Sequence, residues 1–275
     1  MHIPAYPLFT LDPFTTIWSK TDELNRSDTI HWTGKKMPMS ATVRVDNVTY
    51  RLMGKGMSRR LKQEDVRVSP VTTEYVFRGK NFVVELRFST PMRMDDTETL
   101  AYPFSYLDYR FSATDGSTHD VEFTLCADES VCYEKRGAVK CDVQMSGDCE
   151  IASMGLAEQT PLSEEGDSVK INWGYAYLAV QAPGKARIRK TVSGLRISAN
   201  SAFSGVKERS GTFVFAYDDV ESIDYFGDRL QGYWHTRFGN IIEAIEFAVA
   251  KHDELLGAAK AFSEKLLSDA SSPVK

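Results

Sequence analysis

The chain has 275 residues, with 33 basic and 38 acidic side chains and a formal net charge of −5. This balance supplies no electrostatic reason to bind nucleic acid, because phosphate contacts need a basic stripe, and the densest basic run (Lys55 to Lys62) is short and lacks interleaved aromatic residues. No apolar run approaches the ~20 residues that span a bilayer, so we expect neither a nucleic-acid partner nor a membrane span.

The N-terminal segment is rich in polar and aromatic residues, and the pattern of a β-hairpin follows it. Apolar side chains alternate on both sides of Asp46-Asn47, a pair that tolerates positive φ and favours a tight two-residue turn. The alternating residues are Val43, Val45, Val48, Tyr50 and Leu52. A loop rich in aromatic and ionisable groups, fixed to a rigid hairpin, is a common way to build a binding surface.

Strand patterns continue along most of the chain. Residues 74–90 predict a hairpin that turns near Gly79, and residues 105–113 and 121–125 alternate with period 2. Residues 212–217 are apolar on both faces and predict a central strand. Many short strands without intervening helices favour antiparallel sheets packed face to face, so the predicted fold class is a mainly β antiparallel sandwich with C-terminal α-helices.

The strand pattern is interrupted at residues 154–169 and ends at residue 218. Residues 154–169 predict a long surface loop or a boundary between two β layers, and residues 218–227 predict a short helical turn with an acidic start and a glycine stop. Asn240 and Glu243 form a capping box ahead of an amphipathic helix. A second helical run covers residues 258–267, and Ser271-Ser272-Pro273 ends it.

These changes predict a β-sandwich domain over residues 1–235 and a helical linker over residues 236–275. The apolar stripes of the helices need a surface to cover. The sequence leaves three choices open: the sandwich itself, a second copy of the chain, or a separate helical domain.

Several motifs together resemble the bacterial and fungal glutaminase A family. They are PLFTLDPFTTIWSKTDEL and IHWTGKKMPMSATVRVDNVTYRLMG near the N-terminus, then INWGYAYLAV (171–180) and FAYDDVESIDYFGDRLQGYW (215–234). The resemblance implies an N-terminal β-sandwich ahead of an all-helical C-terminal domain, which would be the partner, and hydrolysis of L-glutamine to L-glutamate and ammonia. We expect this chain to be mainly scaffold and docking surface. No signal peptide is evident, and we suspect a secreted or cell-envelope parent.

The candidate interface or binding residues lie inside the family-like motifs. They are Asp12, Trp18, His31, Trp32, Asp218, Asp219, Tyr225 and Trp234. Paired carboxylates among Asp12, Asp218, Asp219 and Asp224 could raise one another's pKa across a cleft and serve as acid and base. The structural alternatives are helix capping by Asp218 and a turn at Asp12 ahead of Pro13.

No motif assigns catalytic residues. The chain has neither a G-x-S-x-G elbow nor H-E-x-x-H, and nothing proposes a metal or a cofactor. Two other hypotheses stay open. One is a carbohydrate-binding or glycoside-hydrolase-associated β-sandwich module that stacks sugars on the four tryptophans, Trp18, Trp32, Trp173 and Trp234. Burial of Trp18 and Trp32 over a sheet edge is the structural alternative. The other is self-association through the C-terminal helices.

The four cysteines lie within residues 126–149 and lack the spacing of a zinc site. If Arg136-Gly137 were a two-residue hairpin turn, Cys132 and Cys141 would lie opposite each other within the range of a disulfide. The alternative, which we favour, is that all four are small buried hydrophobic residues.

Overall fold

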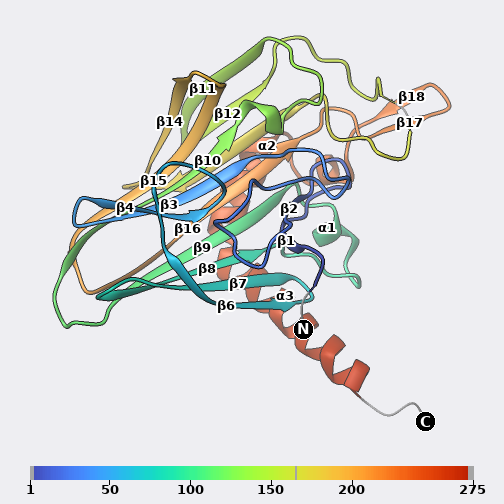
Figure 1. The fold of residues 1–275 in the computed structure, drawn as a ribbon. Helices are drawn as coiled ribbons and strands as arrows, with labels where there is room; N and C mark the ends of the chain where they lie inside the picture. The colour runs from blue at the N-terminus through green and yellow to red at the C-terminus, as the bar shows by residue number, and fades with distance from the viewer. Residues whose placement is uncertain (1–2, 165, 272–275) are drawn as a thin grey trace.

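Two β-sheets dominate the computed structural model, which describes residues 3–164 and 166–271 (Figure 1). The smaller sheet has six strands in the spatial order β14-β15-β10-β3-β4-β5. Its strands are β3 (Met39–Val45), β4 (Val48–Met53), β5 (Arg59–Arg60), β10 (His119–Asp128), β14 (Lys185–Thr191) and β15 (Gly194–Val206). Its pairings are antiparallel except the short parallel contact between β4 and β5.

The larger sheet has eight strands in the order β11-β12-β13-β16-β9-β8-β7-β6, and all its pairings are antiparallel. Its strands are β6 (Lys62–Ser69), β7 (Thr72–Arg78), β8 (Phe82–Ser89), β9 (Phe104–Ala113), β11 (Val139–Ser146), β12 (Cys149–Leu156), β13 (Tyr175–Gln181) and β16 (Glu208–Asp218). The mainly β, antiparallel fold class is therefore confirmed.

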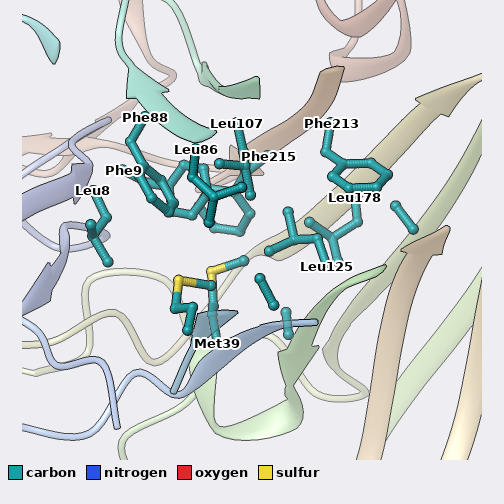
Figure 2. Close-up of a cluster of buried hydrophobic side chains, with 14 of the residues drawn as sticks. Leu8, Phe9, Met39, Leu86, Phe88, Leu107, Leu125, Leu178, Phe213 and Phe215 are labelled. Atoms are coloured by element: carbon teal, nitrogen blue, oxygen red, sulfur yellow. The ribbon is translucent and has the colours of Figure 1, made fainter. Parts of the chain in front are cut away.

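The two sheets share one apolar core. Figure 2 shows Leu125 and Met39 of the six-stranded sheet facing Leu86, Leu178 and Phe215 of the eight-stranded sheet, and these side chains belong to one buried cluster. Strand β8 contributes every second side chain to this core. Phe82, Val84, Leu86 and Phe88 are buried, whereas the side chains between them face outward. This arrangement is sandwich-like, as the period-2 patterns predicted.

The predicted hairpins at residues 43–52 and 74–90 are confirmed. Val45 pairs with Val48, and the connecting residues Asp46 and Asn47 have φ values of 47° and 68°. Positive φ at both central residues is the requirement of the tightest hairpin turns, which Asp and Asn meet at low cost.

Strand β16 is apolar on both faces because both faces are covered. Phe213 and Phe215 enter the core between the sheets, whereas Val214 and Ala216 enter a second cluster beneath α2 (Ile241–Ala250). The Asn240 side chain accepts hydrogen bonds from the N–H groups of Ile242 and Glu243, so the predicted N-cap is confirmed.

The helical stripe of α2 therefore lies on the outer face of the eight-stranded sheet. Helix α3 (His252–Ser271) continues from it, and its distal half extends away from the sheets (Figure 1). Leu266 and Leu267 on that half are exposed. The predicted end of this helix at Ser271-Ser272-Pro273 lies partly outside the described residues. None of the described helices is long and apolar enough to cross a bilayer.

Short elements complete the fold. They are β1 (Tyr6–Phe9), β2 (Ile17–Ser19), α1 (Thr97–Leu100), η1 (Glu129–Val131), β17 (Ile223–Tyr225), β18 (Asp228–Leu230) and η2 (Tyr233–Thr236). Strands β1 and β2 pair with each other, and Phe9 of β1 contacts the rings of Phe88 and Phe215. The N-terminal segment thus covers part of the main core.

Two sequence predictions about local structure are wrong. The helical turn predicted at residues 218–227 is a β-hairpin, because Phe226 and Gly227 both take positive φ and turn β17 back into β18. The loop predicted at residues 154–169 begins later, since β12 continues to Leu156 and its residues there are buried against the neighbouring strands.

The hairpin that would place Cys132 opposite Cys141 does not form. Residue 132 follows η1, and β11 pairs with β12 instead, so Cys141 lies opposite Met154. The Cys132 thiol donates a hydrogen bond to the carbonyl oxygen of that same methionine, and all four cysteines are free. Two are buried and two are half-buried. The possible disulfide between Cys132 and Cys141 is therefore not present in the structure.

Candidate functional site: an acidic pocket beside an apolar hairpin

Segments far apart in the sequence meet at a cavity of about 170 Å³, which we call the acidic pocket. Its walls come from the loop after β1 (residues 11–15), the segment after α1 (100–103), the loop after β16 (217–222) and residues 232–234. Asp12, Asp219 and Trp234, three residues singled out from the sequence, line it together. The fold thus pairs two of the four candidate acids.

Asp12 is held by an Asx-type turn. Its Oδ1 accepts the N–H of Phe14 at 2.8 Å, and its own carbonyl oxygen accepts the N–H of Thr15 at 2.9 Å. Burial raises the pKa of Asp12 to about 6, the negative charge of Asp219 adds to that rise, and the Phe14 N–H opposes it. The turn predicted ahead of Pro13 is present. It places the Asp12 carboxyl, whose pKa is raised, at the wall of the pocket.

Asp219 reaches the pocket from the end of β16. The Ser222 hydroxyl donates to its Oδ2. Burial raises the pKa of Asp219, and the adjacent charge of Asp218 adds to the effect, although the Ser222 hydrogen bond opposes it. Two carboxyls with raised pKa values therefore face one small cavity, the arrangement expected for paired acids.

The other two acids have structural partners outside the pocket. Asp218 Oδ1 accepts the N–H of Val220 at 2.9 Å, which is a turn and not the predicted helix cap. Asp224 lies on β17, where it pairs with Arg229 at 3.0 Å. The sequence could not separate these roles, because all four acids sit in similar motifs.

An aromatic wall closes one side of the pocket. Trp234 is 5% exposed, and its ring lies beside Gly232, where a Cβ atom would come within 2.7 Å of Nε1 of the indole. Tyr217 also lines the pocket and donates a hydrogen bond to the Trp173 carbonyl oxygen at 2.6 Å. Sequence reasoning missed Gly232, since its role depends on this close approach.

His31 and Trp32 hold the loop that carries Asp12. His31 is fully buried, and its Nε2 lies 2.8 Å from the Pro13 carbonyl oxygen, which also accepts the Trp32 Nε1–H at 2.7 Å. Burial lowers the pKa of His31, so its ring is a neutral structural group. These two residues thus fix the loop from behind and do not line the pocket.

The remaining tryptophans do not form a platform. Trp18 lies on β2 with its Nε1 buried, and Trp173 and Trp234 are buried. Of the four, Trp32 alone is largely exposed, at 53%. A four-ring surface for sugars, as hypothesised from the sequence, is therefore wrong.

Next to the pocket, β17 and β18 project from the body of the protein (Figure 1). Four of their exposed side chains are apolar or aromatic, and Phe226 at the tip is 94% exposed. We call this surface the apolar hairpin and define it by Ile223, Tyr225, Phe226, Leu230 and Tyr233. Arg229 steadies its base by hydrogen bonds to the Pro161 carbonyl oxygen and the Glu221 carboxylate.

A second polar cluster lies where α3 begins, between cavities of about 560 and 490 Å³. His252 Nε2 lies 2.8 Å from Asp108 Oδ1, which also accepts from Thr212 at 2.6 Å, while Arg87 binds the other Asp108 oxygen. These contacts connect the start of α3 to β9 through the Asp108 carboxylate. Among the described residues, no group of three or more metal-ligating side chains lies close enough to hold an ion.

Comparisons with known proteins give three findings. The chain is 25% identical to Glutaminase A of Aspergillus oryzae (strain ATCC 42149 / RIB 40) over an alignment of 186 residues, and the match covers 64% of this chain and 27% of that protein. It therefore spans about a quarter of that relative's length. A solved structure titled "Putative kojibiose phosphorylase from human microbiome" aligns with a TM-score of 0.48 at 10% identity, over 93% of this chain and 35% of the other.

Family models cover nearly all of the sequence. Residues 1–62 match a domain of unknown function, DUF4964, and residues 71–203 and 185–269 match a second one, DUF5127. Because the second model matches more than half of the chain, from residue 71 to residue 269, the protein belongs to the DUF5127 family.

Proposed function

We propose that this chain is the β-sandwich portion of a glutaminase A-like hydrolase, and that it supports and docks a helical catalytic domain of the same parent protein. The similarity to Glutaminase A over 186 residues supports the family link. The observation that carries the docking role is the apolar hairpin.

Exposed apolar side chains usually occur singly on a monomer, whereas a contiguous group marks an interaction site. The apolar hairpin gathers five such side chains, of which four lie on the projecting β17–β18 hairpin and the fifth, Tyr233, follows it on η2; three of the five are aromatic. Aromatic residues are enriched at protein–protein interfaces because they bury large areas at low entropic cost. A projecting hairpin of this kind suits insertion between surface helices.

Two experiments test this function. The chain alone is assayed for release of ammonia from L-glutamine, and we expect no turnover; robust activity would refute the scaffold role. In the full-length parent, Phe226→Ser is expected to loosen docking, so that limited proteolysis separates the two domains faster. Val192→Ser, which changes an equally exposed apolar residue on another turn, serves as the control.

Carbohydrate binding remains a second proposal, favoured by the exposed rings of Trp32, Tyr225 and Tyr233. Exposed rings of this kind stack on sugars. Intrinsic tryptophan fluorescence is measured during titration with oligosaccharides and, in parallel, with glutamine. A shift with sugar that Trp32→Ala abolishes would support this function, and the absence of any shift would remove it.

If the chain self-associates through its C-terminal helices, the exposed part of α3 is the surface available for it, because α2 already packs on the sheet. Removing residues 240–275 would uncover the sheet face beneath α2, so deletion is a poor test. The exposed distal half of α3 offers a cleaner one. If Leu266 and Leu267 mediate a dimer, the double substitution to serine lowers the mass measured by light scattering, and an unchanged mass contradicts this route.

A further inference from the structure

The acidic pocket contains polar atoms that the folded chain leaves unused. Asp12 accepts a hydrogen bond at Oδ1 and Asp219 at Oδ2, but the structure gives no donor from another described residue for the second oxygen of either carboxyl. Thr15, which lines the same cavity, is 1% exposed, and its Oγ1 has no hydrogen-bond partner within the described chain.

An unpartnered buried hydroxyl is costly, and among the described side chains that have such an atom, Thr15 is the one that lines the acidic pocket. Paired carboxyls with raised pKa values carry a similar cost, because burial and mutual repulsion both disfavour their charged forms. All three groups meet in one small cavity. A ligand that donates hydrogen bonds and carries positive charge would relieve all three costs.

We propose that the acidic pocket binds the ammonium group of a small primary amine. An ammonium group has three N–H donors and no acceptor. The pocket offers three acceptors: the second oxygen of Asp12, the carboxyl of Asp219, which also interacts with its own backbone N–H, and the Thr15 hydroxyl. The Trp234 ring on the wall adds an aromatic surface, which attracts cations and accommodates a short alkyl chain.

Other ligand classes fit less well. A metal ion would need more ligating side chains than the described residues bring together. An anion would meet two carboxyls and no basic side chain on the pocket walls. The cavity of about 170 Å³ is smaller than the ~300 Å³ at which pockets for drug-sized ligands begin, so the amine must be small. Asp218 and His235 interact electrostatically with Asp219, and the pocket wall itself carries the phenols of Tyr102, Tyr217 and Tyr233.

The test uses the whole chain and propylammonium as the probe, with binding followed by saturation-transfer NMR. We expect propylammonium to bind, and propanol and propionate not to bind. Tetramethylammonium, which has the charge but no N–H donor, is expected to bind at least about tenfold more weakly, because charge-assisted hydrogen bonds are lost. Equal binding of tetramethylammonium, or no binding of propylammonium, would overturn the proposal.

Variants locate the site. Asp12→Asn and Asp219→Asn are each expected to raise the Kd for propylammonium about tenfold or more, whereas Asp228→Asn on the exposed strand β18 leaves it unchanged. Thr15→Val keeps the side-chain shape and removes the unused hydroxyl. It should weaken binding without lowering the melting temperature of the ligand-free protein.

If all of these variants fold and bind propylammonium as the native chain does, the amine binds elsewhere and the assignment is wrong. Binding is measured on this chain directly, so the outcome does not depend on whether the parent protein hydrolyses glutamine.

Discussion

The ionisation of Asp12 gives the sharpest quantitative prediction about stability. In the folded chain its pKa is raised to about 6, mainly by burial, whereas an unfolded aspartate titrates near 3.9. A pKa that is raised on folding stabilises the native state fully at pH values below about 3.9, and this contribution is lost as the pH rises through about 6. At pH 7.5 the ionised carboxylate therefore costs stability.

The size of this cost follows from the two pKa values. Each pKa unit corresponds to 1.36 kcal/mol, so the cost at pH 7.5 reaches about 3 kcal/mol. Because solvent enters the open side of the pocket, we expect about 1–3 kcal/mol. Asp12→Asn removes the charge, and its amide oxygen can still accept the Phe14 N–H. The variant should be more stable than the native chain at pH 7.5 by that amount.

Urea unfolding at pH 7.5 and pH 4.5 measures the effect. At pH 4.5 the advantage of Asp12→Asn should shrink to about 1 kcal/mol or less, because the native Asp12 is then protonated. Protonation of the buried His31 destabilises both proteins at acidic pH and cancels in the comparison. Asp228→Asn, an exposed control, should change stability by no more than about 0.5 kcal/mol. An equal effect of Asp12→Asn at both pH values, or a loss of stability at pH 7.5, would refute the reasoning.

The other predictions concern the helix cap, the aromatic wall and the thiols. Asn240→Ala should cost about 1 kcal/mol in urea unfolding, since two N–H groups of α2 lose their acceptor; no loss would mean that another acceptor replaces it. Gly232→Ala should lower the melting temperature, because the new methyl group meets the Trp234 ring, whereas the φ of −57° at Gly232 suits alanine; an unchanged melting temperature would contradict this close contact. Titration of the unfolded chain without reductant should find four thiols, and fewer would contradict the four free cysteines of the structure.

At the acidic pocket, we expect a change that stabilises the fold to weaken the binding of the amine. Asp12→Asn should stabilise the fold at neutral pH and weaken amine binding, because the same buried charge disfavours folding and attracts the ligand. Such a trade-off is usual where a site keeps polar groups that the fold does not satisfy. Measuring both properties on this one variant therefore links the two predictions.

The sequence by itself determined the elements whose signals are local. Alternation over residues 74–90, the Asp46-Asn47 turn and the Asn240 cap each depend on a few neighbouring residues, and the structure confirms them. The same local reading failed at residues 218–227, because an acidic start and a glycine fit a short helix as well as a hairpin. Only the positive φ at Phe226 and Gly227 distinguishes the two.

The tertiary structure decided which of the predicted residues form a site. The motifs identified Asp12, Asp219 and Trp234 but could not bring them together, since Asp12 and Asp219 are more than two hundred positions apart. It also decided that His31 and Trp32 support the loop and that Thr15 faces the pocket without a partner. The physical reason is that strand periodicity reports which face of a sheet a side chain occupies, whereas a cavity depends on how separate sheets, loops and helix ends pack against one another.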